Sequence, residues 1–195
     1  MFSFEEAQKD HLAYVDAIDR EARQVYLTLV LPHWGEELHG FPYTLYGYMM
    51  TLFARIDLLS AYWAGDASTK GQTLRMIDFM DKYMSSNREA NSVAVQMWRH
   101  KLMHTSEPRN LLDERTNKVY RWLLHWGERL PADQHYTFAE TSDSRILNLG
   151  LLYLIEDLRR AVGTYLSDLS VDPSLQSKYE KVKTEIASYK FRLYS

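Results

Sequence analysis

The residue types best suited to chemistry lie close together, in the stretch MWRHKLMH at positions 97–104. Arg99 is followed directly by His100, and a second histidine, His104, comes four residues later. An imidazole exchanges a proton near neutral pH, and a guanidinium stays charged and binds phosphate through paired hydrogen bonds. One of each forms a minimal set of groups for cleaving RNA without a metal ion.

In such a reaction His104 removes the proton of a ribose 2′-hydroxyl, and that oxygen attacks the adjacent phosphorus. Arg99 stabilises the negative charge that gathers on the phosphoryl oxygens. The expected products are a 2′,3′-cyclic phosphate, or its hydrolysed form, and a 5′-hydroxyl. Lys101 and Arg109, two basic residues near the motif, are expected to bind the substrate.

The same stretch also fits two simpler roles. Basic side chains near the C-terminus of a helix interact favourably with its dipole, which by itself accounts for such residues there. Two histidines four residues apart can also hold a metal ion, but HKLMH lacks the glutamate that zinc proteases place after the first histidine. The spacing of His33, His39, His125 and His135 does not resemble a known ligand set, so we expect neither a metal nor another cofactor.

Hydrophobic periodicity predicts the helices that position the motif. They are expected at residues 4–31, 42–64, 70–84, 88–105, 149–169 and 174–190. The motif then ends the fourth helix, which Pro108 prevents from continuing. In the first helix one apolar stripe is formed by Leu12, Val15, Ile18, Ala22, Val25, Tyr26 and Leu29.

A different pattern follows the fourth helix. Residues 118–126 and 134–140 are expected to pair as a β-hairpin, and residues 145–149 fit either a third strand or the entry to a helix. The sequence therefore predicts a mainly α fold, a single helical bundle over residues 1–195 with a small β-hairpin inserted at about 118–140.

The most apolar segment, residues 41–64, contains Arg55 and Asp57, which favours a buried core helix over a membrane span. Because these two residues point in different directions, each is expected to pair with a neighbouring helix, and one of them can orient the motif. The N-terminus lacks the features of a signal peptide, and the chain has no cysteine. We therefore expect a cytoplasmic protein without a membrane association.

The net charge of −3 is unevenly placed. Residues 1–40 carry eight acids and three bases, whereas residues 99–121 carry six bases and three acids. Nucleic acid, if bound, is expected at the second region, through its local field. The alternative is that both regions are merely solvated faces.

The motif RHKLMH resembles the signature of the HEPN superfamily (higher eukaryotes and prokaryotes nucleotide-binding), in which an Arg, then an Asn, Asp or His, is followed after a short gap by a His. An apolar helix ending in Tyr62-Trp63-Ala64-Gly65 precedes it, with Arg75, Phe79 and Tyr83 on the next helix. This setting, over about residues 40–108, is similar to that of small bacterial HEPN-like proteins.

The resemblance implies a helical, dimeric ribonuclease in which two motifs face one composite cleft. It implies that Arg99 grips phosphate, that His104 is the general base or acid, and that His100 orients the pair or takes part in proton transfer. Many HEPN members are toxins or anti-phage effectors, which suggests an antitoxin-like protein partner. Others are inactive, so a non-catalytic nucleotide-binding, RNA-binding or protein-interaction module on the same bundle is the alternative.

Overall fold

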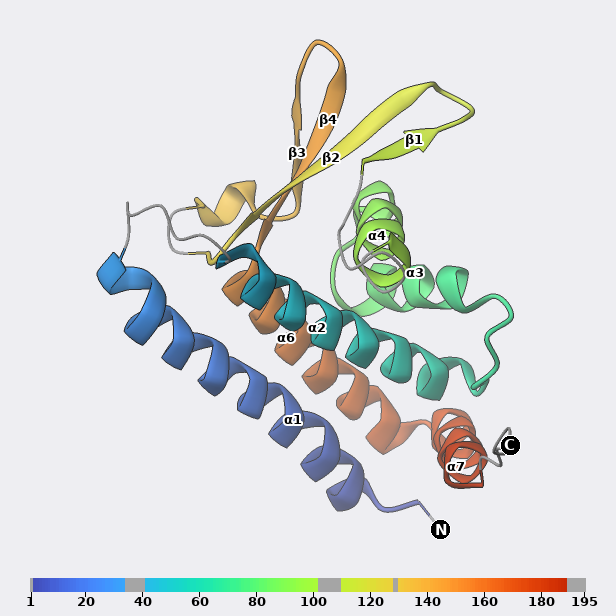
Figure 1. The fold of residues 1–195 in the computed structure, drawn as a ribbon. Coiled ribbons are helices and arrows are strands. Elements are labelled where there is room, and N and C mark those ends of the chain that lie inside the picture. Colours follow the sequence, from blue (N-terminus) through green and yellow to red (C-terminus); the bar gives the residue numbers. More distant parts are fainter. Residues whose placement is uncertain (1, 34–40, 102–109, 128–129, 189–195) are drawn as a thin grey trace, which may run out of the picture.

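The structure is a computed structural model that describes residues 2–33, 41–101, 110–127 and 130–188, with only the backbone of residues 33, 41–44, 100 and 101. This part of the chain is mainly helical and carries one four-stranded sheet (Figure 1). The prediction of a mainly α fold with a small β element is confirmed. None of the helices within these ranges combines the length and the apolar character that a membrane span requires.

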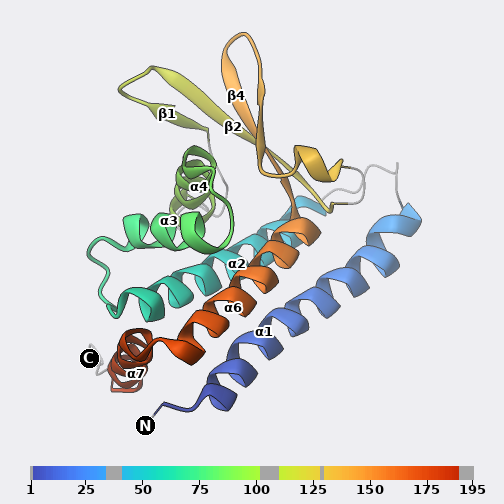
Figure 2. The same ribbon diagram turned by 180° about the vertical axis from the view of Figure 1, so that it is seen from behind.

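Three long helices form the main layer: α1 (Phe4–Val25), α2 (Phe41–Ala64) and α6 (Leu151–Val171). They lie side by side in both opposed views (Figures 1 and 2). The shorter helices α3 (Gln72–Tyr83) and α7 (Pro173–Ala187) pack against α2, and α4 (Arg88–Ala94) packs against α3. Short turns of other helix types are η1 (Tyr26–Val30), η2 (Leu31–His33), η3 (Val95–Lys101) and η4 (Ala132–Gln134).

The apolar stripe predicted for the first helix is confirmed only in part. Val15, Ile18, Ala22 and Tyr26 are buried, whereas Leu29 is 58% exposed. The reason is that α1 ends at Val25 and η1 continues it as a π-helix, whose hydrogen bonds join residues five apart instead of four. This change of period turns the later residues away from the stripe that α1 buries against the core.

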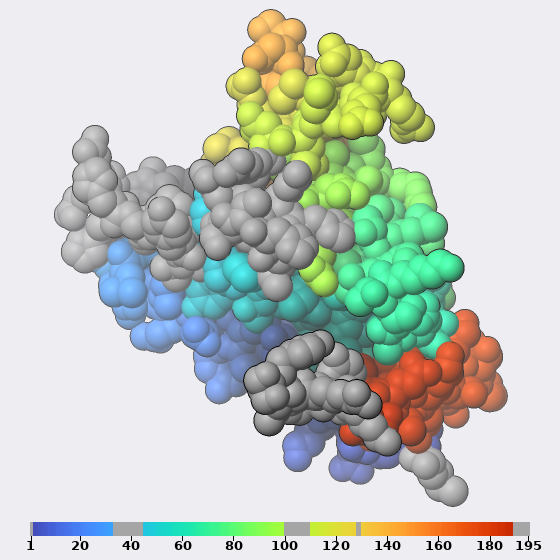
Figure 3. All heavy atoms as spheres, turned by 45° about the vertical axis from the view of Figure 1, so that its right-hand side comes forward, coloured from blue at the N-terminus to red at the C-terminus, as the bar shows by residue number. Residues whose placement is uncertain are grey.

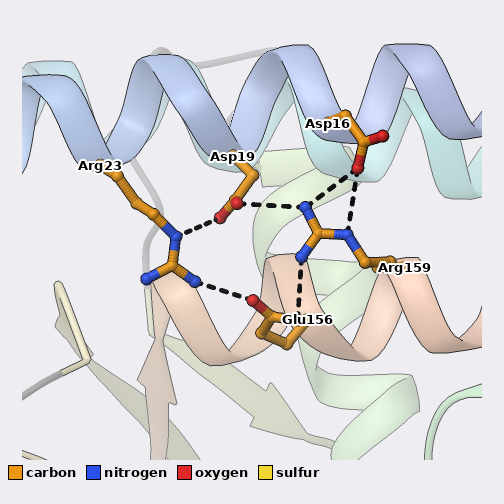
Figure 4. A network of polar contacts seen from close by, with 5 residues as sticks. All are labelled: Asp16, Asp19, Arg23, Glu156 and Arg159. Atoms are coloured by element: carbon orange, nitrogen blue, oxygen red, sulfur yellow. Dashed lines mark hydrogen bonds and ion pairs between the residues drawn. The ribbon is translucent and has the colours of Figure 1, made fainter.

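The acidic side of α1 is joined to α6 by a network of ion pairs (Figure 4). Arg159 contacts Asp16 and Asp19 at 3.1 Å each and Glu156 at 2.9 Å. Arg23 closes the network, at 2.8 Å from Asp19 and 2.7 Å from Glu156. Three of the carboxylates that make these helices acidic are therefore paired within the protein.

The sheet stands at one end of the helices (Figure 1). Its strands are β1 (Leu111–Asp113), β2 (Lys118–His125), β3 (Thr137–Glu140) and β4 (Ser144–Gly150), in the order β1-β2-β4-β3. β2 pairs with β1 antiparallel and with β4 parallel, from Val119 opposite Ser144 to His125 opposite Gly150. β3 pairs with β4 antiparallel.

The predicted hairpin between residues 118–126 and 134–140 is wrong in its pairing, although both segments contain strands. β4 lies between β2 and β3. Residues 145–149, which fitted either a strand or the entry to a helix, therefore form a strand, and it leads directly into α6. The hairpins are instead β1–β2 and β3–β4. In the turn before β2, Asp113 accepts hydrogen bonds from the Arg115 N–H and the Thr116 hydroxyl. Asn117 completes this turn with a φ of 56°, a conformation that asparagine tolerates well.

Candidate functional site

The structure describes the predicted site residues unequally. Arg99 lies on η3 with its side chain described, whereas only the backbone of His100 and Lys101 is described, on the same element. His104 and Arg109 lie outside the described residues. The predicted pairing of Arg99 with His104 therefore stays a prediction, and Arg99 is the residue from which the site can be built.

Arg99 faces Asp57, on the neighbouring helix α2. Arg99 Nε lies 3.4 Å and Nη2 3.5 Å from the same carboxylate oxygen, Asp57 Oδ2. Both side chains are largely enclosed, at 20% and 17% exposure. Because strong N–H···O contacts are usually 2.7–3.2 Å long, this ion pair holds the guanidinium loosely while keeping it near its position.

Asp57 is itself held by α3. Gln72 Nε2 donates a hydrogen bond to Asp57 Oδ2, and Arg75 Nη2 lies 3.9 Å from Asp57 Oδ1. Arg75 is also fixed from the other side, since it donates to the Ser68 carbonyl at 3.1 Å. We call Asp57, Gln72, Arg75 and Arg99 the Asp57 cluster. Its carboxylate stays anchored by Gln72 even when Arg99 turns away.

The two charges on the apolar helix contact different neighbouring helices, as predicted. Asp57 meets α3 and η3, whereas the Arg55 guanidinium turns to α1. Arg55 Nη2 donates at 2.8 Å to the Asp10 carbonyl and at 2.8 Å to His11 Nδ1. Asp57, not Arg55, is therefore the residue placed to orient Arg99.

His11 belongs to a buried polar group away from the Asp57 cluster. Since Nδ1 accepts from Arg55, Nε2 carries the proton and donates to the Tyr179 hydroxyl, 3.1 Å away. Burial, together with the charge of Arg55, lowers the pKa of His11 to about 3. Tyr62 stacks on Tyr179 with ring centroids 4.3 Å apart. This arrangement uses both ring nitrogens and joins α1, α2 and α7.

The helix that carries the motif is not regular. The sequence predicts one α-helix over residues 88–105, but α4 ends at Ala94 and Val95–Lys101 forms the π-helix η3. The rotation of 100° per residue used for an α-helix does not apply in this segment. π-helical turns occur frequently at functional sites, because they shift side chains relative to the neighbouring turns.

The described histidines are not arranged to hold a metal ion. His135 Nε2 lies 3.1 Å from Asp157, and its Nδ1 accepts the Gly150 N–H at 3.0 Å, so both nitrogens are used. Burial lowers the pKa of His125, on β2. Within the described ranges no three His, Asp or Glu side chains come together as a candidate metal site.

Sequence reasoning found Arg99 and Asp57 and noted Arg75, but it missed Gln72. A neutral side chain on the polar edge of a helix gives no signal in a single sequence, whereas a charge within an apolar segment does. No family model matches this chain, and neither the curated proteins nor the solved structures compared with it include a match.

Proposed function

We propose that this protein is a metal-independent endoribonuclease of HEPN type that acts through Arg99 and His104. The observation that supports the proposal most directly is the contact of Arg99 with Asp57. This contact holds a guanidinium, partly enclosed but loosely bound, on an irregular helix segment that precedes His104 in the sequence. A phosphate can replace the Asp57 carboxylate as the partner of Arg99, because both are anions that accept paired hydrogen bonds from a guanidinium.

The reaction proceeds in a single displacement at phosphorus. His104 takes the proton of the 2′-hydroxyl, the 2′-oxygen forms a bond to phosphorus, and the bond from phosphorus to the 5′-oxygen breaks. The departing 5′-oxygen takes a proton from water or from a second imidazole, for which His100 is the candidate. Arg99 stabilises the charge on the non-bridging oxygens. The assembly we propose is a homodimer with two motifs in one cleft, working in toxin–antitoxin or phage-defence systems with an antitoxin-like partner.

The alternative is a non-catalytic nucleotide- or RNA-binding or protein-interaction module on the same bundle. The observation that favours it is again the Asp57 contact, since an arginine already paired within the protein can serve packing alone.

Cleavage of labelled RNA in EDTA tests the proposal, with the purified wild type beside His104→Ala and Arg99→Ala. Arg20→Ala is the matched control, because Arg20 is an exposed arginine on α1. We expect fragments with cyclic-phosphate ends from the wild type and from Arg20→Ala, and none from the other two variants. Equal cleavage by His104→Ala would refute the mechanism, and bound but uncleaved RNA would favour the non-catalytic module.

A further inference from the structure

A groove of about 710 Å³ lies between α4 and the β1–β2 hairpin. The helix contributes Ser92 and Val93, and η3 contributes Gln96, while the hairpin contributes Leu111 and Leu112 together with the polar residues of its turn. Figure 3 shows this hairpin, in yellow-green, standing out beyond the helices. The groove is therefore open to solvent along a surface that the helical core does not fill.

The acids of the groove are already supplied with donors. Glu89 accepts a hydrogen bond from the Tyr120 hydroxyl at 2.7 Å and pairs with Arg145. Asp113 accepts two hydrogen bonds within the turn of the hairpin, at 2.7 and 3.0 Å. These hydrogen bonds keep the pKa of both carboxyl groups below their usual values. Neither carboxylate needs a partner from outside.

One of the three cations of the groove is likewise paired, and the other two are exposed on the hairpin. Arg88 is paired with Asp78 and Asp81 on α3. Arg115, in contrast, has a side chain that is 91% exposed, and its Nε lies 3.9 Å from Asp113, too far for a hydrogen bond. Lys118 is exposed on the same hairpin.

The charge at this groove is therefore opposite in sign to that of the whole protein. The groove is lined by three bases and two acids, in a protein whose net charge is −3. Among the residues that line the groove, the charges of Arg115 and Lys118 on the hairpin rim are exposed, and Glu114, exposed in the same turn, does not line the groove.

The groove also shares the element η3 with the proposed reaction site. Gln96, which lines it and is exposed, precedes Arg99 by three residues on η3. A chain lying in the groove therefore contacts the helix segment that also carries Arg99. An acidic peptide fits less well, because β1 has only three residues and offers little backbone for an added strand.

We infer that this groove binds a stretch of single-stranded RNA beside the cleaved bond, with Arg115 and Lys118 contacting its phosphates. The inference rests on the proposed RNA-directed function. Exposed cations that contact phosphates act through counterion release, so their removal changes both the affinity and its salt dependence. Gln96 and Ser92 offer hydrogen-bonding groups to the same strand from the helix side.

The test compares binding of a fluorescent single-stranded RNA by two double variants across a salt series, all in a His104→Ala background. Arg115→Ala with Lys118→Ala removes the two rim cations. Lys9→Ala with Arg20→Ala removes the same two charges from exposed positions on α1, away from the groove.

We expect the rim variant to make the negative slope of log K against log salt shallower by about 1.4, which corresponds to about 25-fold weaker binding at 0.1 M salt. The α1 variant should bind like the protein with both cation pairs intact.

A second pair of variants tests the helix side of the groove. Gln96→Glu places a negative charge in the groove and should weaken binding, whereas Gln24→Glu, an exposed glutamine on α1, should not.

Each remaining outcome has a defined meaning. Unchanged affinity and slope in the rim variant, no binding of RNA at all, or preferred binding of poly-glutamate would overturn the groove assignment. Groove-dependent binding of RNA that the protein with His104 intact never cleaves would support the groove and refute the proposed ribonuclease. Cleavage of RNA by the protein with His104 intact, together with normal RNA binding by the rim variant, would support the ribonuclease and refute the groove assignment.

Discussion

Protonation of His11 should make the protein lose stability in mild acid. His11 is 2% exposed and neutral, with a pKa of about 3 in the folded protein against 6.5 when unfolded. Between these two values the unfolded chain binds the additional proton, so stability decreases as pH falls below 6.5. At pH 5 the difference of 1.5 units costs about 2 kcal/mol, since one pKa unit corresponds to about 1.4 kcal/mol.

The assay is urea unfolding followed by tryptophan fluorescence, at pH 7.5 and at pH 5, for the wild type and for His11→Asn. Asparagine can accept the hydrogen bond from Arg55 but does not titrate. The variant is therefore expected to lose about 2 kcal/mol less than the wild type between the two pH values, whatever its stability at pH 7.5. All other titrating groups are common to both proteins and cancel in this comparison.

Tyr179→Phe is the control, because it removes the hydrogen bond from His11 Nε2 and leaves the imidazole buried. It should lower stability by about 1 kcal/mol at both pH values and keep the pH dependence of the wild type. If His11→Asn and the wild type lost the same stability on acidification, His11 would not be a buried neutral group, and the hydrogen-bond assignment would fail.

The remaining predictions concern the backbone, the ion pairs and the Asp57 cluster. Gly65→Ala should lower the free energy of unfolding by more than the ~1–2 kcal/mol of a non-glycine residue in the left-handed region, because its Cβ would lie 2.7 Å from a lysine side chain on α7. The Cβ of Gly71→Ala meets no atom within 4 Å, so this variant should lose only that ~1–2 kcal/mol. Thermal unfolding compares the two, and equal losses would contradict the steric reasoning. Arg159→Ala should lose about 1 kcal/mol of stability at low salt and less at 1 M salt, since the ion pairs of Arg159 are partly exposed and are screened by salt. Urea titrations measure this, and a loss of stability that does not depend on salt would show that Arg159 acts through packing. Asp57→Asn removes the carboxylate that competes with phosphate for Arg99, so RNA should bind more tightly, by up to the about fivefold that one phosphate contact is worth at 0.1 M salt; unchanged binding would show that Arg99 does not reach RNA.

The helical part of the fold was predictable because its signal is local. Ser3 and Glu6 have the residue types and spacing of a helix cap, and Ser3 accepts the Glu6 N–H at the start of α1. Val15, Ile18, Ala22 and Tyr26 of the apolar stripe are buried, and Leu12 and Val25 are partly buried against the core. The π-helices η1 and η3 were not predicted, since a shift from four-residue to five-residue hydrogen bonding leaves no clear mark in residue types.

The sheet was predictable as strands but not as pairs. Residues 118–126 have strand composition, yet their partner is chosen by contacts with β4, twenty-five residues further on at each paired position. A single sequence shows alternation within a strand but not which strands meet. The same limit applies to the site: Asp57 needed a partner because it is a charge in an apolar segment, but only the packing of α2 against η3 identifies that partner as Arg99.

The order β1-β2-β4-β3 also bears on how the protein folds. β1 with β2 and β3 with β4 are two local hairpins, each closed by a short turn, whereas the parallel contact of β2 with β4 joins segments far apart in the chain. Local contacts form early and non-local pairing is slow, because the loop between the segments must be ordered first. The two hairpins are therefore expected to form separately and to meet late. Since β4 leads directly into α6, that meeting also completes the docking of α6 with the sheet. Because contacts that form late contribute little to the folding transition state, substitutions along the β2–β4 seam should mainly speed unfolding, whereas those within the hairpin turns should slow folding.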